Sequence, residues 1–262
     1  MIEFTEVSKK FSGQPALNSI SFRVEKGVAC GYIGPNGAGK TTTAKIIVGL
    51  EKPDSGKVRI LSNLEFPSLN HKGKKPKSEI RNSKSQIGYV PESPKLYESL
   101  TPSETIALAA LLRQFDKKCA LDKLEFLAEV FSFEDWLKKP LQSLSKGTKQ
   151  KVVISMALIF KPEILVLDEP TDGLDVQSVV SLKRFIKSFT AHGGAVFYSS
   201  HLLDIVENVC DKVYFINKGN IAAEYARENF IDKKGYLENA LLENIGDATE
   251  QRSIDAFLED KI

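Results

Sequence analysis

The sequence predicts an α/β fold with a mostly parallel sheet, an N-terminal antiparallel β portion and an inserted helical lobe. Short apolar strands alternate with helical segments along most of the chain, which is typical of a parallel sheet with right-handed crossovers. Residues 164–167 are four consecutive apolar residues, the pattern of a strand that is buried on both faces of such a sheet. A glycine-rich loop at 34–41 lies between an apolar strand and a helix.

The N-terminal part is expected to contain mainly strands. Residues 2–7 and 20–24 alternate apolar and polar side chains, as half-buried strands do, and residues 28–33 form an apolar run that ends at the glycine-rich loop. A helix over 41–50 follows and is stopped by a proline and a glycine. Two further strands are expected, over 57–61 and 87–90.

The middle of the chain predicts the helical lobe, placed at about 93–143. Residues 101–137 have apolar side chains at helical spacing and few strand signals. The first helix is expected to start at Thr101, because Glu104 can complete a capping box with it and a proline suits the first helical position. A further helix is expected to begin at Ser145.

Strands and helices alternate again in the C-terminal half. Besides the strand at 164–167, the expected elements are helices over 176–189 and 202–210, a strand over 195–199 and a hairpin of 212–216 with 220–223.

We expect two units along the chain. Residues 1–220 form the main domain, and residues 221–262 form a C-terminal extension packed on it. The stretch after residue 224 is acidic and ends in a weak helical pattern at 254–258.

Composition sets broad limits on function. The chain has 262 residues, a formal charge of +2, 42% apolar and 27% charged residues, which is ordinary for a globular protein. No apolar run approaches the roughly 18 residues of a membrane span, and no signal peptide pattern is visible. Three widely spaced cysteines without a CxxC pattern fit a reducing compartment. We therefore expect a cytoplasmic protein whose membrane role, if it has one, depends on a partner.

The polar segment 62–86 is rich in lysine and arginine and has two interpretations. It is a solvated loop or insertion, or it is a surface that faces anionic lipid headgroups. The sequence leaves both open.

The glycine-rich loop fits G-x-x-x-x-G-K-[ST], and its place between a strand and a helix supports a phosphate-binding loop. Its glycines allow backbone N–H groups to approach phosphates, and the helix N-terminus adds positive partial charge. Lys40 should reach the β- and γ-phosphates, and Thr41 should hold Mg²⁺. The residues expected to bind the nucleotide here are Gly34, Pro35, Asn36, Gly37, Ala38, Gly39, Lys40, Thr41 and Thr42.

Two carboxylates follow the buried strand at 164–167. Asp168 can hold Mg²⁺ through water, and Glu169 can polarise an attacking water as a general base, which contributes roughly 10²–10⁴-fold to a rate. Together with the phosphate loop, these carboxylates predict a P-loop NTPase that binds Mg²⁺ and ATP and hydrolyses the ATP.

The two clusters together resemble the nucleotide-binding domain of ATP-binding-cassette (ABC) transporters, over about residues 2–220. Residues 144–147, Leu-Ser-Lys-Gly, are similar to the family's signature motif. The resemblance implies that Ser145 and Gly147 face the γ-phosphate bound to another subunit, so that two chains enclose two ATP molecules. It also implies that residues 173–175 are the D-loop at the dimer interface.

The same resemblance implies roles for two aromatic or imidazole side chains. His201 matches the switch histidine that contacts the γ-phosphate, and Phe11 matches the aromatic residue that stacks on adenine. A buried core position is the alternative for Phe11.

This chain departs from the family pattern at three places. Lys146 and Thr148 replace the second glycine and the glutamine of the signature, Glu92 replaces the Q-loop glutamine, and Val176 replaces the proline after the D-loop. The lysine and the glutamate are similar to those of cassettes that serve multidrug, polysaccharide and antibiotic exporters. A carboxylate at Glu92 can still ligate Mg²⁺, together with Thr41 and Asp168.

The resemblance implies an ATPase subunit that dimerises, most simply with its own copy, and powers a separate integral membrane permease, in the direction of export. It would lie at the inner face of the cell membrane through that permease. One alternative is an ATPase of DNA repair, chromosome organisation or translation, but no heptad run or basic domain supports nucleic-acid binding. Another is a cassette that binds ATP and signals with little hydrolysis. A small-molecule kinase is disfavoured, and the transported substrate stays open.

Overall fold

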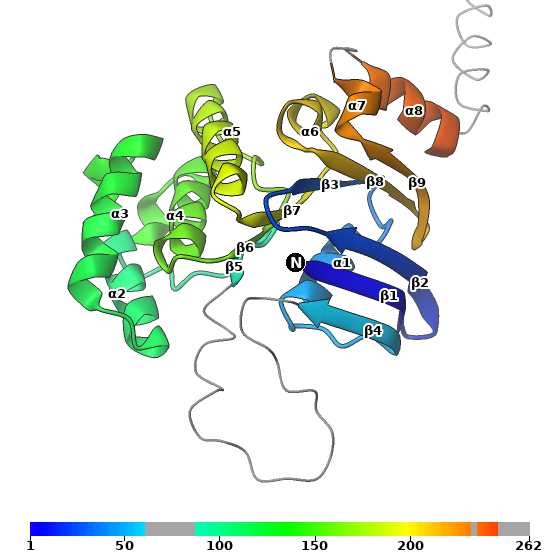
Figure 1. Ribbon diagram of the computed structural model, residues 1–262. Coiled ribbons are helices and arrows are strands. Elements are labelled where there is room, and N and C mark those ends of the chain that lie inside the picture. The colour runs from blue at the N-terminus through cyan, green and yellow to red at the C-terminus, as the bar shows by residue number, and fades with distance from the viewer. Residues whose placement is uncertain (61–86, 232–234, 246–262) are drawn as a thin grey trace, which may run out of the picture.

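The computed structural model describes residues 1–60, 87–231 and 235–245, which form two sheets and surrounding helices (Figure 1). The predicted fold class is confirmed. In the six-stranded sheet the order is β5-β6-β7-β3-β8-β9, and all neighbours are parallel except the antiparallel pair β8 and β9. Its strands are β3 (Ala29–Ile33), β5 (Ile87–Val90), β6 (Ile164–Asp168), β7 (Ala195–Ser200), β8 (Lys212–Asn217) and β9 (Asn220–Ala226).

An antiparallel three-stranded sheet packs against this one, in the order β2-β1-β4. Its strands are β1 (Ile2–Phe11), β2 (Gln14–Val24) and β4 (Ser55–Ile60). Both β1 and β2 are longer than the sequence predicted. Among residues 8–11 and 14–19, the parts that were not predicted, only Leu17 is buried, so backbone pairing holds these ends together without the burial that produces an alternating pattern.

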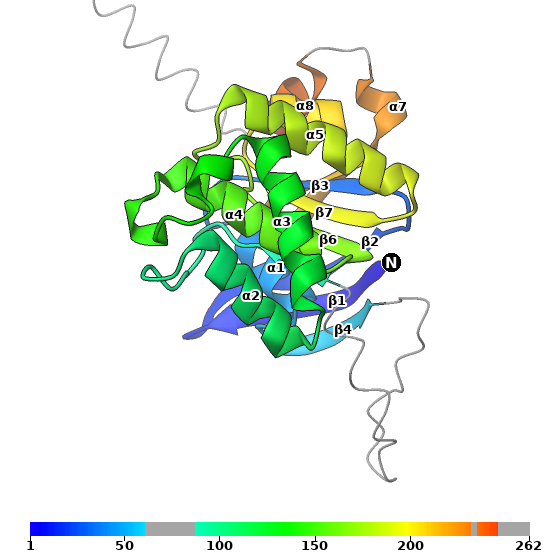
Figure 2. The ribbon, with the colours of Figure 1, turned by 90° about the vertical axis from the view of Figure 1, so that its left-hand side faces the viewer.

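The helices lie around the six-stranded sheet. In both views α2 and α3 form a lobe on the outer side of α4 (Figures 1 and 2). The helices are α1 (Lys40–Ile47), α2 (Pro102–Arg113), α3 (Lys117–Phe131), α4 (Lys146–Ile159), α5 (Val176–Ala191), α6 (Leu203–Val209), α7 (Arg227–Phe230) and α8 (Tyr236–Ile245).

Helix starts agree well with the sequence. The capping box predicted at Thr101 is present: its hydroxyl accepts a hydrogen bond from the Glu104 amide, and the Glu104 carboxylate accepts one from the Thr101 amide. Ser145 caps α4 as expected. The helix predicted over 41–50 ends earlier, because Gly49 leaves the helix with a φ of 74°.

The hydrophobic core has two layers, one on each face of the six-stranded sheet. Side chains of β6 alternate between them: Ile164 and Val166 face the layer that holds α1 and the antiparallel sheet, whereas Leu165 and Leu167 face the layer of α4, α5 and α6. This burial on both faces explains the uninterrupted apolar run of the strand. The layers fix the end of β6, where two carboxylates follow.

The C-terminal part beyond β8 joins the same body. β9 pairs with β8, and Phe230, Leu237 and Ala240 are buried in the core. Helix α8 was not predicted from the sequence. The division of the chain at residue 220 remains a prediction, and the segments 62–86 and 254–258 lie outside the described residues. Within the described ranges, no helix combines the length and apolar character that crossing a membrane requires.

The antiparallel sheet is joined to the six-stranded sheet by an aromatic cluster centred on Phe22. Its ring lies 4.5 Å from Phe4, 5.4 Å from Tyr32, 5.6 Å from Tyr214 and 6.1 Å from Phe197, measured between ring centroids. We expect Phe22→Ala to lower the free energy of unfolding by about 3–5 kcal/mol, because the cavity cannot collapse between two sheets. Urea denaturation followed by circular dichroism measures this.

The matched control is Phe126→Ala, because the Phe126 side chain is 65% exposed on α3. This substitution should change the free energy of unfolding by no more than about 0.5 kcal/mol. Equal costs for the two variants would contradict the role assigned to the cluster.

Asp175 caps α5 and pairs with Lys151 of α4. Its carboxylate accepts a hydrogen bond from the Ser178 amide at 2.8 Å and one from the Lys151 ammonium at 2.7 Å. The Lys151 hydrogen bond is the main cause that lowers the pKa of Asp175 from 3.8 to about 2. A lowered pKa in the folded state stabilises the protein above pH of about 4, and this contribution is lost as the pH falls toward about 2.

We therefore expect the difference in unfolding free energy between the parent and Asp175→Asn to be constant above about pH 5 and to shrink below about pH 4. Since the Asp175 side chain is 54% exposed, the difference should stay below about 1 kcal/mol. Urea unfolding at a series of pH values measures it. A difference that does not change with pH would exclude the charge as its cause.

Candidate nucleotide-binding and hydrolysis site

A cavity of about 220 Å³ lies where the loop after β3 meets the ends of β5 and β6. In a parallel sheet these carboxyl ends share one edge, which is where such folds bind ligands. Most of the residues that the sequence assigned to phosphate binding line it. The lining residues are Ala16, Pro35, Asn36, Gly37, Gly39, Lys40, Thr41, Thr42, Glu92 and Glu169.

Two glycines shape the loop. A Cβ on Gly34 would lie 2.1 Å from the carbonyl oxygen of Ile216, so no side chain fits between the loop and β8. Gly39 has a φ of 112°, which allows the sharp entry into α1 directly before Lys40. Gly34 and Ala38 lie behind the cavity lining, and Ala38 is buried in the core.

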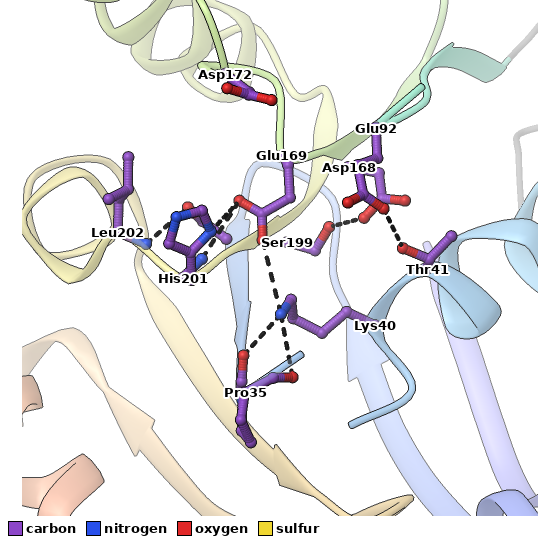
Figure 3. A network of polar contacts seen from close by, with 12 residues as sticks. Pro35, Lys40, Thr41, Glu92, Asp168, Glu169, Asp172, Ser199, His201 and Leu202 are labelled. Atoms are coloured by element: carbon purple, nitrogen blue, oxygen red, sulfur yellow. Dashed lines mark hydrogen bonds and ion pairs between the residues drawn. The ribbon is translucent and has the colours of Figure 1, made fainter. Parts of the chain in front are cut away.

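Lys40 is a buried cation at the wall of the cavity, only 7% exposed. Its ammonium donates hydrogen bonds to the carbonyl oxygens of Gly34 at 2.7 Å and Pro35 at 3.4 Å. It also lies 3.6 Å from a carboxylate oxygen of Glu169, as Figure 3 shows. A cation held in this way on a helix N-terminus is suited to binding phosphate groups.

Asp168 is fully buried at the end of β6. The hydroxyl of Ser199 donates a hydrogen bond to its Oδ1 at 2.5 Å, whereas its Oδ2 has no hydrogen-bond partner among the described residues. Burial raises the pKa of Asp168, and the nearby Glu92 and Glu169 raise it further, while the Ser199 and Thr41 hydroxyls oppose the shift. A buried carboxylate oxygen without a partner fits a cation ligand.

Two more oxygen donors lie next to Asp168. The Thr41 hydroxyl donates a hydrogen bond to Glu92 Oε2 at 3.3 Å, and both side chains line the cavity (Figure 3). Hydroxyl and carboxylate oxygens are the donors that Mg²⁺ prefers. Across the described ranges, no group of three His, Cys, Asp or Glu side chains is arranged to hold a metal by itself.

Glu169 has an unusual backbone and two polar neighbours, Lys40 and His201. Its φ is 48°, in the left-handed region that non-glycine residues rarely adopt, and its amide donates to the Ser199 carbonyl at 3.0 Å. The carboxylate lies 2.9 Å from His201 Nδ1 on one side and faces Lys40 on the other. Strain of this kind concentrates at functional sites, and here it turns the carboxylate into the cavity.

Besides Gly34, Ala38, Asp168 and His201, three further predicted residues do not line the cavity. Phe11 is 43% exposed, which excludes a buried core role, and the Lys9 ammonium lies 5.1 Å from its ring centroid. Ser145 and Gly147 lie at the start of α4: the Ser145 hydroxyl accepts a hydrogen bond from the Thr148 amide at 3.1 Å. The predicted site residues therefore form separate groups within one chain.

Sequence reasoning missed Ser199 and Ala16. Ser199 lies directly beside Asp168 in the register of β6 and β7, and a polar residue at the end of a buried strand next to the carboxylate strand was the available signal. Ala16 contributes to the cavity from β2 and has no chemical signal in the sequence.

Comparisons with known proteins identify the family of the chain. The family model described as ABC transporter matches residues 17–172. The chain is 34% identical over 240 residues to the bacitracin transport ATP-binding protein BcrA of Bacillus licheniformis, covering 91% of this chain and 74% of that protein. It is 30% identical over 233 residues to the Nod factor export ATP-binding protein I of Burkholderia lata, covering 89% and 73%.

The fold is also found in a solved structure. The structure of an ATP binding subunit of an ABC transporter superposes with a TM-score of 0.78 and 30% identity, over 93% of this chain and 98% of that one. Fold, phosphate loop and relatives agree, and the chain belongs to the ABC transporter family, among its ATP-binding proteins.

Proposed function

We propose that this chain binds ATP in the 220 Å³ cavity, hydrolyses it as a dimer of two copies, and thereby powers a separate membrane permease. The observation that carries the proposal is the approach of the Lys40 ammonium to the Glu169 carboxylate, at 3.6 Å, in the wall of one cavity. A cation for the phosphates and a base for water are thus held side by side.

Hydrolysis requires that phosphate charge be stabilised while a water is activated. Lys40 and the N-terminal amides of α1 supply fixed positive charge where the phosphates would lie. Glu169 accepts the proton of the attacking water, and the hydrogen bond to His201 at 2.9 Å orients its carboxylate. We assign the contact with the γ-phosphate to His201, whose side chain is 59% exposed and lies 2.9 Å from the Glu169 carboxylate.

We assign Mg²⁺ to the oxygens of Thr41, Glu92 and Asp168. The partnerless Oδ2 of Asp168 and the contact between Thr41 and Glu92 support this assignment. When bound, the ion supplies positive charge that neutralises phosphate oxygens.

A second copy of the chain would complete the site. Ser145 and Gly147 start α4, whose N-terminus favours an anion, but they do not line the cavity of their own chain. A phosphate bound to the other copy is the anion that they would meet. The exposed Phe11 would stack on adenine.

The transporter role is supported by the relatives. One is named for bacitracin transport and another for Nod factor export, so we assign this chain to an exporter. The permease would hold it at the inner face of the membrane and select the substrate. Affinity purification from detergent-solubilised native membranes, followed by mass spectrometry, tests the assignment: a stoichiometric multi-span protein supports it, and recovery of the chain without one contradicts it.

A second candidate function is a cassette that binds ATP and signals with little hydrolysis. Glu92 favours this reading, because it places a second carboxylate next to Asp168 and close to the phosphates. Multiple turnovers by the purified chain would remove this candidate.

Glu169→Gln should lower kcat for ATP hydrolysis by about 10²–10⁴-fold, since an amide of the same shape cannot accept a proton. Phosphate release at saturating ATP measures it. Glu98→Gln is the control, because Glu98 pairs with Lys149 outside the cavity and its loss should leave kcat unchanged. Hydrolysis by Glu169→Gln at the parental rate would refute the base assignment.

Lys40→Ala should weaken ATP binding by at least about tenfold, because charge-assisted hydrogen bonds to phosphate are lost. Calorimetric titration of ATP in the presence of EDTA measures binding without turnover. The control is Lys45→Ala, which removes an exposed lysine from the same helix and should not change the affinity. Equal affinities of the parent and Lys40→Ala would refute the phosphate site.

A further inference from the structure

The turn after Glu169 is attached to the first half of α4 by side-chain contacts. We call residues 170–175 the post-Glu169 turn. The Lys146 ammonium donates to Asp172 Oδ2 at 2.6 Å, the Gln150 amide to the Pro170 carbonyl at 3.0 Å, and the Lys151 ammonium to Asp175 Oδ2 at 2.7 Å. The attachment therefore runs along the whole turn.

The backbones of the two segments also touch. A Cβ on Gly147 would lie 2.2 Å from the Gly173 carbonyl oxygen, so the start of α4 and the turn leave no room for a side chain. Lys146 covers this contact: a Cβ on Gly173 would lie 3.4 Å from both Cγ and Cδ of Lys146. The lysine stem thus lies along the turn while its ammonium reaches the carboxylate.

A backbone hydrogen bond also connects the post-Glu169 turn to Glu169 itself. The Asp172 amide donates a hydrogen bond to the Glu169 carbonyl at 3.3 Å. Glu169 holds its left-handed φ of 48° at this point. A contact that fixes Asp172 therefore supports the strained backbone of Glu169.

We propose that Lys146 is a positioning residue for hydrolysis: through its ion pair with Asp172 it fixes the post-Glu169 turn on α4 and so holds Glu169 in place. A glycine at position 146 would offer neither the stem nor the ammonium. The inference rests on the proposed ATPase function. Its structural claim, that the ion pair of Lys146 and Asp172 fixes the turn on α4, also applies to the chain without nucleotide.

The electrostatics favour Asp172 over a phosphate as the partner of Lys146. A lysine in the first turn of a helix faces the positive end of the helix dipole, and a carboxylate at 2.6 Å compensates that charge. The alternative is that Lys146 binds a phosphate of the ATP that is held by the second copy.

The first test is hydrogen–deuterium exchange of the nucleotide-free chain. Lys146→Ala and Asp172→Asn should each increase exchange of the amides of Asp172 and Leu174 by about two- to fivefold, and the double variant should add nothing. The effect is modest because the two side chains are 72% and 52% exposed. The exchanged pair, Lys146→Asp with Asp172→Lys, should restore protection.

The second test is ATP hydrolysis by the same variants. Each single variant should lower kcat by about two- to fivefold with unchanged KM, and the exchanged pair should recover kcat. The control is Lys149→Ala, which removes an ion pair of 2.7 Å from the same helix that does not touch the turn. It should change neither readout.

The outcomes separate the inference from the proposed function. Unchanged exchange in Lys146→Ala and Asp172→Asn would overturn the inference, whether or not the chain hydrolyses ATP. A raised KM in Lys146→Ala alone, without rescue by the exchanged pair, would assign Lys146 to phosphate instead. Failure of the parent to hydrolyse ATP would refute the proposed function, and the exchange data would still decide the role of Lys146.

Discussion

The structure depends on how it stabilises two buried carboxylates, Asp168 and Glu169, at the carboxyl end of β6. Asp168 and Glu169 follow a strand whose side chains are buried on both faces, so neither carboxylate is stabilised by bulk water. The chain compensates with the Ser199 hydroxyl for Asp168 and with Lys40 and His201 for Glu169. Ser199 and His201 come from the end of β7, and Lys40 comes from the start of α1 after β3, so the site exists only when the parallel strands are in register.

The two core layers hold that register. Because alternate side chains of β6 enter different layers, a shift of the strand by one residue would move each of its four apolar side chains into the opposite layer, where it would have to pack against other neighbours. The aromatic cluster around Phe22 fixes the antiparallel sheet on one layer, and α4 packs in the other. The post-Glu169 turn lies between β6 and α5, which places the strained Glu169 backbone at the junction of sheet and helices.

The features that could be predicted from the sequence are those in which a short local pattern allows only one structure. The phosphate loop, the capping box at Thr101 and the apolar strand before Asp168 are of this kind. Sequence reasoning could not predict features that depend on contacts between distant segments, such as Ser199 beside Asp168 or Lys146 beside Asp172. The extra length of β1 and β2 was missed because backbone pairing of exposed residues leaves no hydrophobic period. The roles of the individual site residues remain proposals.

The central claim is that the groups needed for hydrolysis lie on two copies of the chain, because Ser145 and Gly147 start α4 away from the cavity that Lys40 and Glu169 line. Native mass spectrometry of the purified chain with a non-hydrolysable ATP analogue tests this claim most directly. The account predicts a complex of two chains with two nucleotides that is absent without nucleotide. A complex of one chain with one nucleotide at every concentration, from a preparation that hydrolyses ATP, would contradict it.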